Sequence, residues 1–507
     1  MTTFEPTEFL EWFQKAGGWY NDKYLGLKPF EGMGYGALAL DCILEDTPLF
    51  HIPDSLILSP FTSELSTKLS ENEWERLDHG WCKLILVMMW ESERGKESPW
   101  SGYLSNMPRV FDTPMLWDDE ERKELVGTDI EDRIGKEEAE KEYTEHLLPV
   151  IKAHPELFPP SSTHHTLDSF HLQGSRILSR SFTVPSSRFN PKDKESDGES
   201  DFSDDDDDED QIAVMIPFAD MLNAAFERDN AHLFADEEIN NENENEHDKG
   251  KEKGKGFTMK STKVIEKDEQ IYNTYASPPN SELLRKYGHV DILPLPFDLL
   301  ALLTEEEIGG WGYGNPADEV LIHGEMVLKC VEKVTNKQQG KDLDKWKGKM
   351  TKRIDWWLEE GQEDMFPLSL SPEIDESLIA FIRLLIYDQE WLRAKKKGKL
   401  PTTTIDNDVA AIIREAIQNR LSRHIGDTKI QSDLNIIQSL EIDHIPRPNA
   451  STTQADGIKA EAKGEQVTAK NLRKCYAAIV RLGEKRILNV ALRIVEGQLN
   501  KKRKAED

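Results

Sequence analysis

The spacing of apolar residues changes at about residue 293, and this change most limits the folds open to the chain. Before it, short runs of β-forming residues such as 37–43 and 212–218 are separated by glycines and prolines, as in small strands and hairpins. Beyond it, apolar residues recur at helical spacing, as at Ile374, Leu378 and Leu385. The pattern predicts an α+β part followed by an all-α part. The 507 residues also exceed what a single core normally organises.

We predict a first domain at residues 1–292, an all-helical domain at 293–500 and a basic tail at 501–507. Residues from about 64 to 182 have helical character and form an insertion in the first domain, and the apolar run 83–90 predicts a buried helix within it. Two acidic insertions, at about 186–211 and about 236–255, are predicted to be disordered, the second as the solvated extension of a hairpin.

The chain carries a formal net charge of −32, and its acidic residues are concentrated. Residues 193–210 contain 12 acidic side chains and one lysine. Such a charge repels nucleic acid and anionic membranes and attracts basic proteins, so we expect a basic protein partner and neither direct nucleic-acid binding nor membrane binding. A Ca²⁺ site at Asp204–Asp208 lacks the ligand spacing and the glycine turn of a calcium loop, which favours a solvated run.

Cysteine usage and hydropathy further limit the class of protein to which the chain can belong. The four cysteines (Cys42, Cys82, Cys330, Cys475) are far apart and include no CxxC pair, so we expect neither a metal site nor a disulfide framework. Scattered thiols fit a reducing compartment. No apolar stretch of about 18 residues predicts a membrane span, and the N-terminal residues lack an apolar signal core. We therefore expect an intracellular protein.

Two segments in the first domain carry candidate binding groups. Glycines alternate with other residues from Gly32 to Gly36, so the backbone there can turn tightly and approach a ligand, although an ordinary hairpin turn explains them equally well. Arg180 follows Ser179 at the predicted end of a helix. Its guanidinium group can hold a carboxylate in a bidentate contact, or can simply complement the helix dipole.

Two later segments carry short polar side chains and tyrosines. Asp220 and Asn223 follow an apolar strand, where they can serve a site or cap a turn. Tyr272 and Tyr275 lie three residues apart on a predicted strand and therefore point to opposite faces. Spacing alone leaves open which of the two faces a site and which is a core residue.

Taken together and in order, these segments resemble the SET-domain methyltransferases of the Rubisco and ribosomal-protein lysine methyltransferase branch, and most of all its fungal ribosomal group. The resemblance covers about residues 5–495 apart from the acidic insertions. It rests on the segments Glu31–Gly34, Ser179–Phe182, Pro217–Asn223 and Tyr275 with Asn280–Gly288, and further on Ser98–Leu104, Asp112–Trp117 and Arg481–Leu488.

The resemblance implies an α+β SET-domain fold of small β-sheets with a pseudoknot and a helical insertion, followed by an all-α substrate-binding domain. It implies an S-adenosyl-L-methionine-dependent protein-lysine N-methyltransferase. The residues implied to bind the cofactor are Glu31, Gly32, Met33, Arg180, Asn223, Ala224 and Tyr275. Tyr275 is also the implied catalytic residue, so the resemblance makes Tyr272, on the opposite face of the strand, the expected core residue. Ser179, Asp220 and Tyr287 are implied to contact the target lysine. The family commonly has histidine where this chain has Ala224, so position 224 can contribute only through its backbone.

Methyl transfer to an amine needs a neutral lysine, whose ordinary pKa is about 10.4. An aromatic-lined channel disfavours the ammonium form, and Tyr275 is expected to align the reactants without acting as the base. Charge and resemblance together favour a ribosomal protein of the large subunit as substrate. The alternative is a catalytically silent SET-like protein that holds basic partners. Residues 501–504 (Lys-Lys-Arg-Lys) can be a nuclear import signal or the end of a helix, and we expect residence in the nucleus, with a cytoplasmic share.

Overall fold

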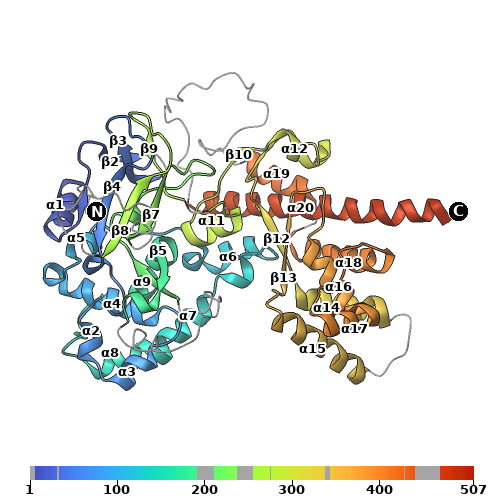
Figure 1. The fold of residues 1–507 in the computed structure, drawn as a ribbon, viewed down its shortest axis with the longest axis horizontal. Helices are drawn as coiled ribbons and strands as arrows, with labels where there is room; N and C mark the ends of the chain where they lie inside the picture. Colours follow the sequence, from blue (N-terminus) through green and yellow to red (C-terminus); the bar gives the residue numbers. More distant parts are fainter. Residues whose placement is uncertain are drawn as a thin grey trace. The chain divides into compact units, whose positions relative to one another are not determined.

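A computed structural model gives the fold as two compact units (Figure 1). The first unit comprises Met1–Phe111 and Gly135–Ser277, and the second comprises Asp112–Ile134 and Pro278–Asp507. The structure describes residues 6–30, 33–190, 211–236, 255–274, 276–336, 343–426, 429–439 and 469–506. The chain thus passes into the second unit at residue 112 and again at residue 278, whereas the predicted boundary was a single crossing at about 293.

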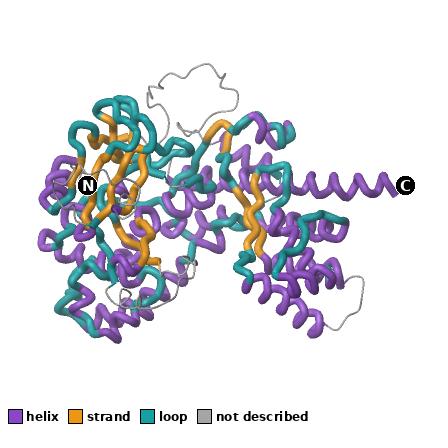
Figure 2. Tube along the Cα trace, in the orientation of Figure 1, coloured by secondary structure: helices purple, strands orange, loops and turns teal. Residues whose placement is uncertain are grey.

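Three small antiparallel sheets form the β part of the first unit. The largest has the order β1-β4-β8-β7, another has the order β2-β3-β9, and β5 pairs with β6. Figure 2 shows these strands gathered in the first unit. Their bounds are β1 Trp19–Tyr20, β2 Leu25–Phe30, β3 Gly34–Ala39, β4 Pro48–Pro53, β5 Ser181–Pro185, β6 Gln211–Met215, β7 Ala231–Ala235, β8 Gly256–Ser261 and β9 Gln270–Ile271. Strands far apart in sequence pair here, as β4 with β8 and β3 with β9.

The helical insertion predicted for about 64–182 is present. Its buried helix is α4, in which nine residues are buried, because the run is apolar on all faces. The helices of the first unit are α1 Pro6–Lys15, α2 Leu65–Lys68, α3 Glu71–Arg76, α4 Cys82–Arg94, α5 Ser101–Leu104, α7 Lys136–Glu142, α8 Leu148–Ala153 and α9 Leu167–Arg180, with short turns at η1 Asp54–Leu56, η2 Gly95–Glu97, η6 Tyr143–Leu147, η7 Ser186–Arg188 and η9 Ala219–Met221.

The second unit is mainly helical, as the apolar spacing predicts. Its helices are α6 Asp119–Arg122, α11 Asn280–Tyr287, α12 Phe297–Leu300, α13 Glu305–Ile308, α14 Gly324–Asn336, α15 Leu343–Glu359, α16 Glu376–Ile386, α17 Asp388–Lys397, α18 Asn407–Arg423, α19 Ile430–Ser439 and α20 Ala469–Glu506, with short turns at η3 Pro114–Leu116, η4 Lys123–Leu125 and η5 Glu131–Arg133. Two strand pairs were not predicted: β10 Leu293–Pro294 with β11 Tyr313–Gly314, and β12 Glu319–His323 with β13 Met365–Ser369. The two-residue strands β10 and β11 are too short to show alternation in sequence, whereas the five-residue strands β12 and β13 alternate in burial and were missed.

A buried ionic network explains why residues near 129 belong to the second unit. Arg420 on α18 donates to Asp129 at 2.7 Å and to Glu484 on α20 at 3.0 Å, and His424 lies 2.8 Å from the same Glu484 oxygen. All four residues are buried. Breaking such a network by removing one partner costs several kcal/mol, about 3–5 in measured cases. The network therefore fixes the excursion of the chain at 112–134 onto α18 and α20.

The edges of the two acidic insertions are ordered, which corrects the predicted bounds. Ser186–Arg188 forms a helical turn, and Arg188 donates to Asp54 at 2.8 Å and to the Gly256 carbonyl at 2.8 Å. Asp236 accepts from Thr258 at 3.0 Å and lies 3.0 Å from the His51 ring. These partners are supplied by distant strands and are invisible in the local sequence. The remaining insertion residues, 191–210 and 237–254, lie outside the described residues.

Strands β7 and β8, on either side of the second insertion, pair in antiparallel register with Ala235 opposite Phe257, as the predicted hairpin requires. Within the described ranges, no helix has both the length and the apolar character that a membrane crossing needs. No cluster of three or more metal-type ligands occurs in the same part of the chain.

Candidate active site

The end of helix α9 meets the turn η9 in the first unit. Arg180, the last residue of α9, donates from Nη1 to the Asp220 carbonyl at 2.8 Å and to Asp220 Oδ2 at 3.4 Å. The Asp220 side chain is 1% exposed, whereas that of Arg180 is 27% exposed and therefore remains accessible to a ligand. Two residues that the sequence analysis singled out separately are thus in direct contact.

A strained residue directs Asp220 inward. Phe218 has φ +80°, a left-handed conformation that costs a bulky residue about 1–3 kcal/mol. Its ring is fully buried, stacks on Phe50 at 4.4 Å and meets Phe9 and Phe13 edge-on. This packing holds Phe218 in place, so the chain leaves β6 in a sharp turn. Asp220 is consequently buried instead of capping a helix at the surface, the alternative considered from sequence.

Tyr103 on α5 completes the contacts of Asp220. Its hydroxyl donates to Asp220 Oδ2 at 3.0 Å, and the ring is 2% exposed. The sequence analysis used the segment Ser98–Leu104 only for its resemblance and assigned Tyr103 no role. A contact between residues 117 positions apart leaves no signal in a single sequence.

Burial controls the titration of this cluster. Burial raises the pKa of Asp220, while Arg180 and the Tyr103 hydrogen bond oppose that rise. Burial together with the Asp220 charge raises the pKa of Tyr103 well above its usual value, so the phenol stays protonated. Burial also lowers the pKa of Arg176, one turn before Arg180, to about 10. The site therefore keeps a neutral phenol and the charged guanidinium group of Arg176 near one carboxyl group at neutral pH.

A second polar centre lies at Gly36, Asn223 and Gln270. A Cβ atom on Gly36 would stand 2.6 Å from Asn223 Nδ2 and 2.7 Å from Gln270 Nε2, so any side chain there would displace these amides. Both amide nitrogens are buried and have no hydrogen-bond partner within the described part of the chain. Buried donors without a partner are uncommon in folded proteins and indicate a missing acceptor. The sequence analysis predicted Asn223 but missed Gln270 on β9.

The segment around Asn223 lies against the chain that follows β9. Asn273 donates its backbone N–H to the Asn223 carbonyl at 3.0 Å, and Ala224 next to it is half-buried. Residues 50 positions apart therefore share this centre. Tyr272 is 6% exposed, with the Arg228 guanidinium 4.9 Å from its ring centre, so the prediction of a buried Tyr272 is confirmed.

For the other predicted site residues, the structure gives no contact that tests the predicted role. Glu31, Gly32 and Tyr275 lie outside the described residues, so the structure says nothing of their contacts. Met33 is 39% exposed. Ser179 donates to the Ser175 carbonyl at 2.8 Å within its own helix. Tyr287 ends α11 in the second unit, where its ring centre lies 5.9 Å from that of His289. The roles of all these residues remain predictions.

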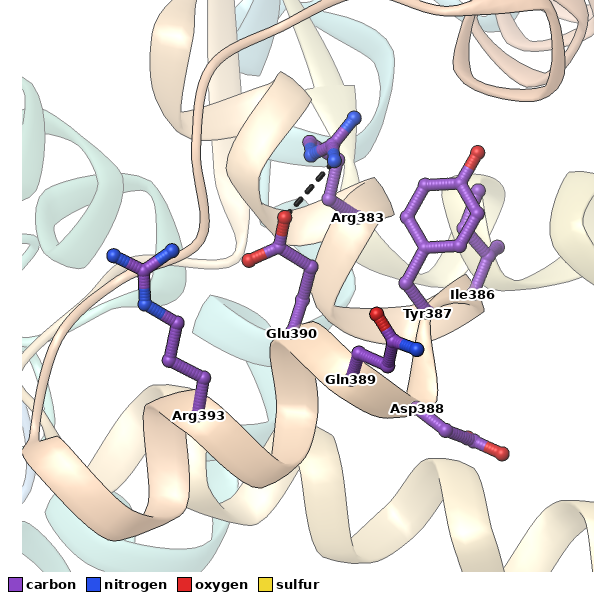
Figure 3. A pocket seen from close by; sticks show the side chains of 7 residues that line it. All are labelled: Arg383, Ile386, Tyr387, Asp388, Gln389, Glu390 and Arg393. Atoms are coloured by element: carbon purple, nitrogen blue, oxygen red, sulfur yellow. Dashed lines mark hydrogen bonds and ion pairs between the residues drawn. The ribbon is translucent and has the colours of Figure 1, made fainter.

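A cavity of about 520 Å³ lies in the second unit, at the junction of α16 and α17 (Figure 3). One of its two arginines, Arg383, is already paired with Glu390 at 2.9 Å and with Asp406 at 2.8 Å. None of the residues implied by the resemblance lines it. The lining residues are Arg383, Ile386, Tyr387, Asp388, Gln389, Glu390 and Arg393. We assign this cavity no part in the candidate site.

Comparison with known proteins identifies lysine methyltransferases as relatives. The chain is 33% identical to ribosomal lysine N-methyltransferase 4 of Saccharomyces cerevisiae over 280 residues, covering 54% of this chain and 53% of that protein. It is 30% identical to N-lysine methyltransferase setd6 of Xenopus laevis, covering 57% and 58%. These matches thus span just over half of each relative. No family model matches the chain.

Solved structures extend the likeness to almost the whole chain. The SET domain of LSMT bound to lysine and AdoHcy superposes with a TM-score of 0.62 at 18% identity, covering 98% of this chain and 92% of that one. Rubisco LSMT bound to AdoMet gives a TM-score of 0.59 at 19% identity, covering 99% and 96%. The chain therefore has the SET-domain fold followed by a helical region. The predicted fold class and the predicted resemblance are both confirmed.

Proposed function

We propose, from this SET-domain fold and its lysine-methylating relatives, that the protein is an S-adenosyl-L-methionine-dependent protein-lysine N-methyltransferase. The observation that carries the proposal is the pair of buried amide nitrogens of Asn223 and Gln270 beside Gly36, to which no described residue supplies an acceptor. On a SET-domain fold, donors kept free in this way suit a ligand rich in acceptors.

The chemistry of these groups fits the cofactor. S-adenosylmethionine presents a carboxylate, ribose hydroxyls and adenine nitrogens, and it supplies the electrophilic methyl group when bound. Arg180 offers a partly exposed guanidinium for the carboxylate, and guanidinium–carboxylate contacts are strong, often bidentate hydrogen bonds. Asn223 and Gln270 offer amide donors at the narrow backbone of Gly36, with Glu31–Met33 and Ala224 as further contacts implied by the resemblance.

The chain's own residues must then align a neutral lysine. Holding a lysine of pKa about 10.4 neutral near pH 7 costs roughly 4–5 kcal/mol, and a water-poor site near cations lowers that cost. Arg176 and Arg180 provide such cations. We propose that Tyr275 aligns the amine through its oxygen and that Ser179 and Tyr287 line its approach. Most of the acceleration comes from positioning, with proton loss to water.

We further propose a ribosomal protein of the large subunit as substrate, bound as a basic protein partner. The name of the Saccharomyces cerevisiae relative supports this choice, and so does the net charge of −32, which steers lysine-rich proteins toward the chain.

The test is methyl transfer from labelled S-adenosylmethionine to purified ribosomal proteins. We expect label on one basic protein with the wild type and its loss with Tyr275→Phe. The neighbouring variant Tyr272→Phe is the matched control, because Tyr272 is a buried residue to which no role in transfer is assigned, and it should retain transfer. If histones are labelled and no ribosomal protein is, the proposal of a ribosomal substrate is wrong, whereas the proposal of a lysine methyltransferase stands.

A catalytically silent SET-like binding protein is the second candidate. It is favoured by Ala224, whose side chain cannot supply the imidazole that the family commonly places there. Failure to bind S-adenosylmethionine in equilibrium dialysis, together with no transfer to ribosomal proteins or histones, would support this second function over the enzyme.

We also propose residence in the nucleus, with a cytoplasmic share, through the basic residues 501–504. Replacing these four residues by alanine in a fluorescent fusion should shift the protein to the cytoplasm. An unchanged distribution would show that the basic cluster only ends the helix.

A further inference from the structure

Only one of the two carboxyl oxygens of Asp220 accepts hydrogen bonds from side chains in the described residues. Oδ2 accepts from the Tyr103 hydroxyl at 3.0 Å and lies 3.4 Å from Arg180 Nη1. Oδ1 is buried, and no described residue supplies it with a donor. Leaving a carboxylate oxygen unpaired in the interior costs free energy. A purely structural ion pair would satisfy both oxygens, so the free Oδ1 indicates a reserved acceptor.

Tyr103 acts only as a hydrogen-bond donor to Asp220. The phenol stays protonated, and its single O–H can serve only one oxygen of the carboxyl. Its helix is also held rigidly. Trp12 on α1 donates from Nε1 to the Pro99 carbonyl at 3.1 Å, and a Cβ on Gly102 would collide with Trp12 at 2.2 Å. Tyr103 therefore fixes which oxygen of Asp220 is occupied.

We propose that Tyr103 is a positioning residue, which holds Asp220 through Oδ2 and thereby keeps Oδ1 open for the amino group of the target lysine. The proposal rests on the proposed function. The lysine arrives as an ammonium group, because its ordinary pKa is about 10.4, and it must then lose a proton to water before methyl transfer. A carboxylate oxygen in a water-poor site forms a strong, charge-assisted hydrogen bond with such a group.

The groups that face Asp220 come from two elements. Helix α5 supplies Tyr103 and α9 supplies Arg180, and the backbone N–H of Asp220 also faces its own carboxyl group. Arg176 lies near Tyr103, and Arg109 lies near Arg176. Arg180 and the Tyr103 hydrogen bond both hold the Asp220 pKa below the value that burial alone would impose. Removing the Tyr103 hydroxyl therefore raises the Asp220 pKa further.

The test compares Tyr103→Phe with Tyr143→Phe in the full chain. Tyr143 is an ideal control, since it is also a buried tyrosine of the first unit with one hydrogen bond, to the His165 carbonyl at 2.9 Å. We expect Tyr103→Phe to raise KM for the protein substrate about tenfold, as loss of a hydrogen bond to a charged group does. The Kd of S-adenosylmethionine should change less than twofold, and the acid limb of the kcat/KM profile should move to higher pH. Tyr143→Phe should change none of these.

A double variant separates positioning from a direct contact. If Tyr103 acts through Asp220, then Tyr103→Phe combined with Asp220→Asn should equal Asp220→Asn alone. Additive losses in the double variant, or identical behaviour of Tyr103→Phe and Tyr143→Phe, would overturn the proposal.

A readout without turnover keeps this test independent of the proposed function. Because burial raises the Asp220 pKa, its contribution to stability decreases as pH rises from the unfolded value toward the folded pKa. We measure urea unfolding as a function of pH, with Asp220→Asn as the reference. The pH range over which the stabilising contribution of Asp220 is lost should extend to higher pH in Tyr103→Phe and should be unchanged in Tyr143→Phe. An unmoved pH range would overturn the positioning role, whereas absent methyl transfer by wild type would overturn only the enzyme proposal.

Discussion

At the scale of single residues, Gly36 contributes to the candidate site through its lack of a side chain. The glycine leaves room for two amide nitrogens within 2.7 Å of where a Cβ would stand. Sequence analysis recognised that glycines alternate in this segment but could not tell a hairpin turn from a binding surface. The distinction needed Asn223 and Gln270, which are brought to Gly36 from positions far along the chain.

Gly36→Ala should therefore weaken cofactor binding at least about tenfold, because the new methyl group displaces one or both amides. Isothermal titration with S-adenosylmethionine measures the change. Gly174→Ala is the matched control in α9, where the nearest atom to a new Cβ is 3.9 Å away. It should leave binding intact and stabilise the chain by up to about 1 kcal/mol. Equal affinities for the two variants would exclude Gly36 from the cofactor site.

At the scale of elements, ion pairs decide which segments belong together. Glu282 in the first turn of α11 is paired with Arg285 at 2.8 Å, with Lys286 at 3.1 Å and with Arg133 of η5 at 2.8 Å. These cations, with hydrogen bonds from Arg285, lower the pKa of Glu282 to about 2 against the opposing effect of burial. The contacts join residues near 133 to α11 inside the second unit.

This pKa predicts an acid sensitivity. A carboxyl group with a folded pKa of about 2 and an unfolded pKa of about 4.5 stabilises the fold fully above the unfolded value. That contribution, up to about 3 kcal/mol, is lost as pH falls from 4.5 toward 2. Glu282→Gln should remove this part of the pH dependence, measured by urea unfolding between pH 6 and pH 3. A variant with an unchanged slope would show that the pairs contribute little.

Also at the scale of elements, the sequence predicted helices with an apolar face but did not predict that a charged segment is buried. Helical spacing located α4, α9 and α16 because each buries an apolar face that is visible locally. The charged run Arg481–Arg486 resembled the family without revealing a role. In the structure Arg481, Glu484, Lys485 and Arg486 are all buried, paired with partners such as Asp433 and Arg420. A charged segment normally indicates exposure, so only tertiary contacts could identify it as core.

At the scale of the whole molecule, the net charge of −32 should govern encounter with the substrate. Methylation of a lysine-rich protein should slow as salt rises from about 0.05 to 0.5 M, because screening shortens the range of attraction. Steady-state rates at low substrate concentration measure this effect. Rates on a basic protein that do not change with salt would contradict steering.

Deleting residues 193–210 isolates the source of the steering. The deletion removes 12 acidic residues and one lysine, and therefore lowers the negative charge by 11. It should weaken the salt dependence on a basic protein while leaving the rate on a neutral lysine peptide unchanged. A loss of rate on both substrates would instead assign the segment a role in the fold.

The sequence by itself determined the fold class, the helical insertion, the helical character beyond residue 293 and the resemblance, because each depends on local spacing or on short ordered motifs. It also singled out Arg180, Asp220 and Asn223. Only the tertiary structure decided that Arg180 and Asp220 touch, that Tyr103 holds one carboxyl oxygen, and that Gln270 joins Asn223 at Gly36. The physical reason is common to all three. Burial and pairing depend on partners tens to hundreds of residues away, and they are fixed by packing such as that around Phe218, which no local pattern encodes.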